Sequence, residues 1–152
     1  MESNGQMALP LGRIEQGQIV TYRFTVPGLP PSKNTYDGLP PQWKNSMKHK
    51  WIRAVIREVE AQNMPRGVAK IGLSAVLVFP TKRRRDPQNY APALWNWVPD
   101  ALQKCGVIHD DKDGMIDFGP NLGIQFALDE RRGINPDRRK RTQIAITMRV
   151  AA

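Results

Sequence analysis

The sequence predicts one α/β domain in which helices pack on a mixed β-sheet. Its 152 residues, of which 40% are hydrophobic, are enough for a single core. Two patterns occur along the chain. Alternation of apolar and polar residues indicates strands, and an apolar repeat of about 3.6 residues indicates an amphipathic helix. The predicted order is β-α-β-α-β-β, which favours a layered structure. We expect residues 1–17, which are polar and punctuated by Gly and Pro, to form a flexible arm before a domain over residues 18–152.

The first part of the domain is predicted to contain a strand, an irregular loop and a helix. Apolar and polar residues alternate over Gln18–Val26, as in a half-buried strand. The following Pro/Gly segment, residues 27–41, is too broken for regular structure. From about Gln42 to Asn63 the apolar residues recur with a helical period and the outer face is basic. The sequence MPRG at positions 64–67 ends this helix.

The second part is predicted to supply the central strand and another helix. Lys70–Phe79 is the most apolar run of the chain, which indicates a central strand. Asn89–Lys104 reads as a helix, in which Pro92 and Pro99 must lie in the first turn or at kinks. Gly106 is a helix-stop residue. Two further strands are expected, over Leu122–Leu128 and Thr142–Val150.

Composition and charge favour particular kinds of binding partner and one cellular compartment. The net charge of +9 favours an anionic partner. Nucleic acid ranks ahead of a membrane, because the chain has no apolar span of about 20 residues and no basic amphipathic membrane helix. A single cysteine, Cys105, excludes an internal disulfide, and two distant histidines argue against a structural zinc site. The first residues lack a secretory signal pattern, so we expect a cytoplasmic protein.

A basic run and an acidic segment carry most of the chemistry. Four cations at positions 82–85 run directly into Asp86, and acids return between positions 110 and 117. Cations bind a polyanion, whereas clustered carboxylates repel one unless a divalent metal lies between them. The combination predicts a protein that binds a phosphate backbone and carries Mg²⁺ or Mn²⁺.

Asp86 and Asp111 are the main candidates for catalytic metal ligands, with Asp110 assisting. Asp86 follows the central strand, and the residues after it do not form a capping pattern that would explain it fully. In extended backbone Asp110 and Asp111 point to opposite sides, so only one of them faces Asp86, and we favour Asp111. Asp113 and Asp117 are assigned to an outer shell or to solvent. An EF-hand is excluded, because no glutamate stands at its twelfth position.

Three segments are candidates for DNA contact, each with a plainer alternative. The arginine run and the basic stretch before the last strand are also compatible with solvated loops, and PPSKNTY is also compatible with ordinary turn chemistry. The candidate residues in these segments are Lys33, Asn34, Lys82, Arg83, Arg84, Arg85, Arg138, Arg139, Lys140 and Arg141.

These motifs resemble the RusA family of Holliday-junction resolvases, small phage and prophage endonucleases. The resemblance spans about residues 18–150. It implies a homodimer that cuts four-way DNA junctions, with Mg²⁺ held by Asp86 and Asp111 beside Asp110, in a bacterial host cytoplasm. It also adds Asn89 to the DNA-binding candidates. The shared motifs are PPSKNTY at 30–36, RRRD ending at Asp86 with Asn89 three residues on, DALQKCGV at 100–107, and HDD at 109–111 followed by Ile116-Asp117.

Two departures from the family pattern keep alternatives open. Gln88 stands where the family commonly has a second aspartate, and the following helix has no lysine before Lys104. One alternative is therefore a non-catalytic DNA-binding protein with a degenerate nuclease site. Another is a nuclease with a D…(D/E)-x-K signature, built from Asp100 and residues 110–112. That signature needs its first aspartate at a strand, whereas Asp100 lies on a predicted helix.

Overall fold

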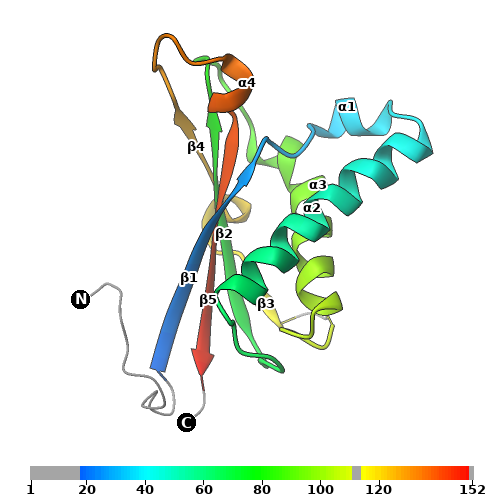
Figure 1. The fold of residues 1–152 in the computed structure, drawn as a ribbon, viewed down its shortest axis with the longest axis vertical. Coiled ribbons are helices and arrows are strands. Elements are labelled where there is room, and N and C mark those ends of the chain that lie inside the picture. The colour runs from blue at the N-terminus through cyan, green and yellow to red at the C-terminus, as the bar shows by residue number, and fades with distance from the viewer. Residues whose placement is uncertain (1–17, 111–113, 151–152) are drawn as a thin grey trace.

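The fold is organised around β2 (Ile71–Phe79), the strand in the middle of the sheet (Figure 1). The computed structural model describes residues 18–110 and 114–150. β5 (Arg141–Val150) runs antiparallel to β2, and β1 (Gln18–Pro27) runs antiparallel to β5. The predicted central position of β2 is therefore confirmed, as are the first and last strands.

The other edge of β2 is covered by two short parallel strands. β4 (Ile124–Leu128) pairs with its second half, and the two-residue β3 (Ile116–Asp117) pairs with its first two residues. Over the described residues this gives a five-stranded mixed sheet in one α/β domain, which confirms the predicted fold class. The prediction placed the start of β4 two residues early and did not include β3, because a two-residue strand has no periodicity to detect.

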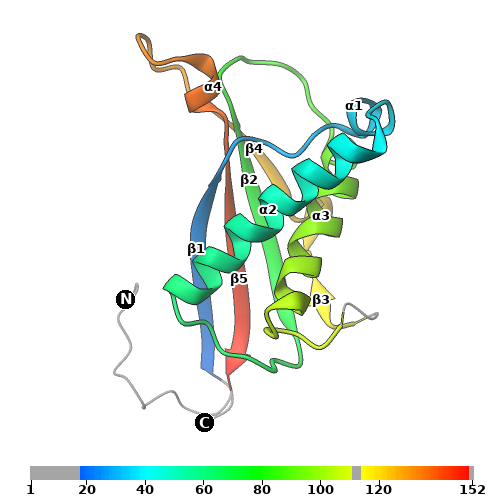
Figure 2. The same cartoon turned by 45° about the vertical axis from the view of Figure 1, so that its right-hand side comes forward.

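Helices cover one face of this sheet (Figures 1 and 2). α2 (Pro41–Ala61) crosses it, and α3 (Pro87–Lys104) packs on α2. Residues Leu73 and Leu77 of β2 are fully buried on the same face, whereas Ser74 on the opposite face is exposed. None of the described helices combines the length and apolar character that crossing a bilayer requires.

Both long helices end on a residue with left-handed backbone. Gly106 has φ +83°, its N–H donates to the carbonyl of Gln103, and the next N–H donates to the carbonyl of Leu102 at 2.9 Å. This is the Schellman motif, so the predicted stop at Gly106 is confirmed. α2 ends in the same way on Asn63, with φ +50°.

The structure corrects the prediction in two loop segments and within one helix. The segment expected to be irregular contains α1 (Lys33–Asp37), because Ser32 supplies a side-chain cap by accepting a hydrogen bond from the Thr35 N–H. α4 (Pro136–Arg139) forms within the basic stretch, capped by Asn135. Pro92 and Pro99 lie inside α3, which excludes the first turn as one of their two predicted placements.

The turn between β3 and β4 depends on Gly123, which has φ +71° and closes the short helix η1 (Pro120–Gly123). A Cβ atom at this position would lie 2.6 Å from the carbonyl oxygen of Phe118 and 2.8 Å from that of Leu73. Both obstacles are backbone atoms, so neither moves easily. Gly133 has a similar φ of +79°, yet a Cβ there would meet nothing within 4 Å.

We therefore expect Gly123→Ala to lower the melting temperature much more than Gly133→Ala. Gly133→Ala, the control, should lower the free energy of unfolding by about 1–2 kcal/mol, because alanine disfavours left-handed backbone. Gly123→Ala carries the same cost and a further loss of about 1–3 kcal/mol from overpacking. Thermal unfolding followed by circular dichroism measures both. Equal melting temperatures for the two variants would contradict the close approach at Gly123.

Candidate nucleic-acid interface

A cleft of about 590 Å³ opens where β2 ends. Segments far apart in the sequence line it: the chain after β1, the arginine loop after β2, the first turn of α3, and the region of α4. Two of the three predicted DNA-contact segments, the arginine run and the basic stretch, contribute cations to its lining. These cations are Arg83, Arg84, Arg85 and Lys140.

Backbone hydrogen bonds hold these segments together. The Gly28 N–H donates to the Lys140 carbonyl at 3.0 Å, and the Thr142 hydroxyl donates to the Gly28 carbonyl at 2.9 Å. The Asp129 N–H donates to the carbonyl of Phe79, the last residue of β2, at 2.8 Å. The chain after β1, the chain after β4 and the start of β5 are thereby fixed around the end of β2.

The PPSKNTY segment lies beside the same cleft. Ser32 and Thr35 line it, and Lys33 and Asn34 are exposed on α1 between them. The ring of Tyr36 packs edge-on against Trp97 of α3 with centroids 5.7 Å apart, which fixes α1 to the helical layer.

The arginines of the run differ in what they can do. The Arg85 guanidinium lies 3.6 Å above the Phe79 ring and donates hydrogen bonds to the Thr81 and Arg83 carbonyls, so its contacts stabilise the loop. Arg83 and Arg84 are exposed on the rim of the cleft. Of these three arginines, Arg83 and Arg84 therefore present the more exposed side chains at the cleft. Lys82, which precedes Arg83, and Asn89, in the first turn of α3, are also exposed.

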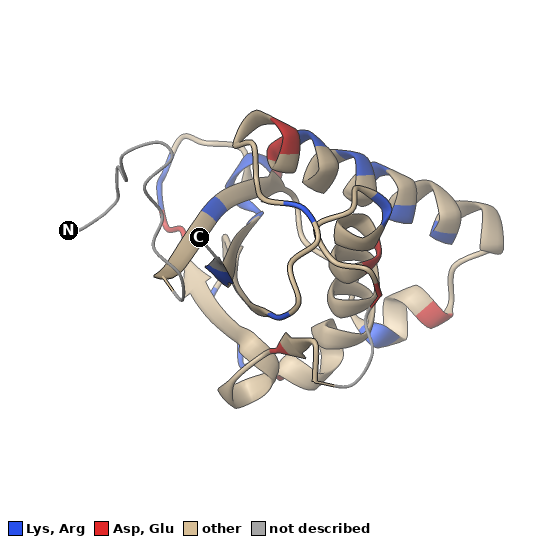
Figure 3. Ribbon diagram, turned by 90° about the horizontal axis from the view of Figure 1, so that it is seen from below, with Lys and Arg blue, Asp and Glu red and all other residues tan. Residues whose placement is uncertain are grey.

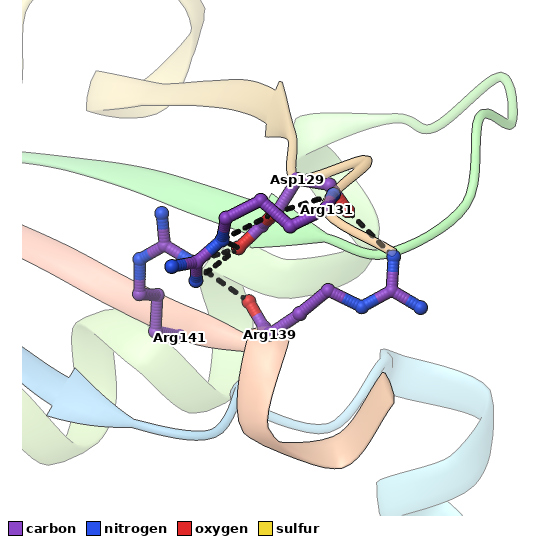
Figure 4. Close-up of polar contacts among 4 residues, drawn as sticks. All are labelled: Asp129, Arg131, Arg139 and Arg141. Carbon is purple, nitrogen blue, oxygen red and sulfur yellow. Dashed lines mark hydrogen bonds and ion pairs between the residues drawn. The ribbon is translucent and has the colours of Figure 1, made fainter. Parts of the chain in front are cut away.

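A buried carboxylate organises the other basic stretch (Figure 4). Asp129 is only 5% exposed, and its oxygens accept hydrogen bonds from Arg131 and Arg141, both with contacts of 2.7 Å. Arg139 donates to the Asp129 carbonyl at 2.9 Å. The hydrogen bonds from Arg131, reinforced by those from Arg141, hold the pKa of Asp129 well below its usual range against the opposing effect of burial.

This cluster divides the predicted DNA-binding residues of the stretch. Arg139 and Arg141 are half-buried and bound to Asp129, so they stabilise the cleft wall. Lys140 lines the cleft and pairs with Asp137 at 3.4 Å, and Arg138 is exposed. Sequence reasoning did not select Asp129, although two acids, Asp129 and Glu130, directly before two arginines are a signal for an ion pair.

A second basic surface runs along α2, where Lys and Arg positions succeed one another (Figure 3). Lys50, Arg53 and Arg57 are exposed there. Lys44 lies over the Tyr36 ring at 5.1 Å, and Lys48 pairs with Asp100 at 3.4 Å.

Asp86 has a structural role that the sequence interpretation missed. It is the N-cap of α3, and its Oδ1 accepts a hydrogen bond from the Gln88 N–H at 3.0 Å. Pro87 occupies the first helical position, which is typical of a helix start. The expectation that capping does not explain Asp86 is therefore wrong. The side chain remains exposed, at the cleft end of the molecule, and Gln88 is exposed in the first turn beside it.

Asp110, the described acid of the HDD motif, lies at the other end of α3. Asp110 follows the helix end, where the Val107 carbonyl accepts from the Val68 N–H just before β2 begins. An 18-residue helix is roughly 27 Å long. One chain therefore does not bring Asp110 beside Asp86. Asp111 and Asp113 lie outside the described residues.

The remaining acidic side chains have other partners. Asp117 is exposed on β3 and accepts a hydrogen bond from the Gly119 N–H. Asp100 lies on α3, as predicted, and not at a strand, which argues against the D…(D/E)-x-K arrangement. Among the residues that the structure describes, no group of three or more His, Cys, Asp or Glu side chains is placed to hold a metal ion.

Asp129→Asn should lower the melting temperature by several degrees near neutral pH, because it leaves Arg131 and Arg141 without their anionic partner. The pKa of Asp129 is lower in the folded chain than the usual value of about 3.9. Its stabilising contribution is therefore complete above that value and is lost as pH falls below about 4 toward the folded pKa.

Melting curves of both proteins from pH 3 to 8 test this. The difference between them should be constant above about pH 5 and shrink below about pH 4. Asp137→Asn is the control, since Asp137 forms an ion pair with its side chain 83% exposed, and such pairs contribute little. A difference that grows on acidification would contradict the assignment.

Comparison with known proteins does not assign a family to this chain. No protein-family model matches the sequence, and no curated protein matches it. The resemblance to the RusA family therefore rests on the motifs in the sequence.

Proposed function

We propose that this protein is a metal-dependent endonuclease that binds and cuts branched DNA, such as a four-way junction, as a homodimer. The observation that carries the DNA-binding part is the convergence of basic segments on one cleft. Arg83 and Arg84 from the loop after β2 and Lys140 from the stretch before β5 line it, together with Thr35 of α1. Such a surface binds the phosphate backbone without reading base sequence.

The catalytic part rests on the carboxylates and on the RusA-like motifs. Asp86 is exposed directly after Arg85, a residue of the cleft lining, and aspartate oxygens are ligands that Mg²⁺ and Mn²⁺ accept. A bound divalent ion supplies a nucleophilic hydroxide at neutral pH and neutralises charge on the leaving oxygen. Asp86 holds its place through the α3 cap, and the arginines orient the backbone against it.

A homodimer gives a route to a complete metal site. Within one chain a helix separates Asp86 from Asp110, so the three proposed ligands cannot meet on one ion. Two chains related by a two-fold axis can place Asp86 of one chain beside Asp110 and Asp111 of the other, and they do so twice. Two equivalent sites also suit paired cuts across a symmetric junction.

A non-catalytic DNA-binding protein is the second candidate. It is favoured by the engagement of Asp86 as a helix cap and by Gln88, a neutral side chain, beside it. Cleavage of a labelled four-way junction with Mg²⁺, with EDTA as the control, distinguishes the two. Binding without cleavage would leave only this second function.

The exposed arginines should carry the salt dependence of DNA binding. We expect Arg83→Ala with Arg84→Ala to weaken junction binding and to reduce the slope of log affinity against log salt by roughly two, because each phosphate contact contributes about 0.9. Titrations at several salt concentrations measure the slope. Lys50→Ala with Arg53→Ala removes the same charge from α2 and should change the slope less. Equal losses in the two double variants would remove the assignment to the cleft.

Mixed dimers test the shared metal site. Asp86→Asn and Asp111→Asn should each abolish cleavage while preserving junction binding, because the cations supply most of the affinity. When the two variants are co-expressed and purified as heterodimers, one of the two sites is intact in the shared arrangement. We expect these heterodimers to nick the junction once.

The two homodimeric variants, tested alone, are the control for that experiment. Heterodimers that bind the junction and never nick it would mean that the ligands are not shared between chains. Cleavage by Asp86→Asn at the parent rate would exclude Asp86 from the site altogether.

A further inference from the structure

We propose that the cleft at the end of β2 holds a single unpaired DNA base together with its phosphate. This inference rests on the proposed DNA-binding function and adds which part of the DNA enters the cleft. A base at a branch point or bulge can leave its stack at a lower cost than a base within a duplex.

The cleft is lined by both cationic and apolar side chains, whereas a phosphate backbone alone would require only the cationic ones. Arg83, Arg84 and Lys140 provide positive charge, whereas Leu29, Pro30 and Tyr90 provide apolar and aromatic surface. Phosphates are bound by cations and N–H groups, and apolar walls contribute nothing to them. A nucleotide presents both an anion and a flat apolar ring, so it uses both parts of the lining.

The volume of the cleft agrees with this occupant. About 590 Å³ lies within the range of roughly 300–1,000 Å³ for sites of small ligands. The cleft is open to solvent on one side, so a nucleotide can enter while its chain continues in both directions.

Tyr90 provides the stacking surface. It is half-buried in the first turns of α3, and its ring meets Phe79 of β2 and Phe126 of β4 edge-on, with centroids 5.7 and 5.8 Å apart. Two edge contacts from a buried strand and its neighbour fix the plane of the ring. Stacking on a fixed aromatic ring is how proteins bind unpaired bases without sequence preference.

Arg85 completes the wall and leaves the phosphate to its neighbours. Its guanidinium is held over Phe79 and hydrogen-bonded to Thr81 and Arg83, so it is already positioned before DNA binds. The exposed Arg83 and Arg84 precede it on the rim. The base thus lies against Tyr90, with the phosphate toward the rim.

Binding to three DNA ligands in EDTA tests the proposal by fluorescence anisotropy. One is a duplex with a one-nucleotide bulge, the second has an abasic residue in the bulge, and the third is fully paired. The abasic ligand keeps the phosphate and the bend and lacks only the base. We expect it to bind roughly 5- to 150-fold more weakly than the intact bulge, the range that loss of one stacked base produces.

Substitutions in the protein test which residue causes the difference in affinity between the intact and abasic bulges. Tyr90→Ala should abolish the difference between the intact and abasic bulges, and Tyr90→Phe, which keeps the ring, should retain it. Arg138→Ala, an exposed cation outside the cleft lining, should weaken all three ligands alike.

The outcomes separate this inference from the proposed function. If the parent protein binds the intact and abasic bulges equally and tightly, the base does not enter the cleft, while DNA binding stands. If the parent protein binds neither the three duplex ligands nor a four-way junction, both proposals fail. If Tyr90→Ala retains the difference between the bulges, the stacking surface lies elsewhere and the assignment to this cleft is overturned.

Discussion

The burial of β2 is the constraint on which the rest of the structure depends. Its side chains alternate so that Ile71, Leu73 and Leu77 lie in the core under the helices, and its backbone pairs on both edges. A strand with both edges occupied has no freedom to shift its register without exposing its apolar face. The loop after Phe79 therefore starts from a fixed point, and so do the segments that bond to that end of the strand.

The course of α3 determines what the acidic residues can do. It begins at the end of β2 and returns to the level where β2 starts, since residues 106 and 107 bond to residues 67 and 68. Asp86, which caps the helix, and Asp110, which follows it, consequently lie at opposite ends of the same element. A geometry that separates the proposed ligands in one chain gives a physical reason for a dimer: symmetry rather than chain folding would bring them together.

Asp129 offsets the repulsion between positive charges near the cleft. In a chain of net charge +9, several arginines converge near one end of the sheet, and they repel one another. A buried carboxylate that accepts hydrogen bonds from Arg131 and Arg141 offsets this repulsion and fixes both side chains. Arg131 and Arg141 are thus held by an internal anion, whereas the exposed Arg83 and Arg84 line the cleft itself.

Local sequence patterns were enough to predict the α/β class, the described strands other than β3, the two long helices and the stop at Gly106. These features follow from local periodicity and from glycine at a left-handed position, which need no distant partner. Packing between distant segments placed Tyr90 in the same cleft as the arginine loop and brought Asp129 to arginines before and after α4. It also decided that the predicted helix between Asp86 and Asp110 runs back to the level where β2 starts. Spacing in sequence gives no direction in space, so the motif could identify these carboxylates, while only the packing of α3 on the sheet set the distance between them.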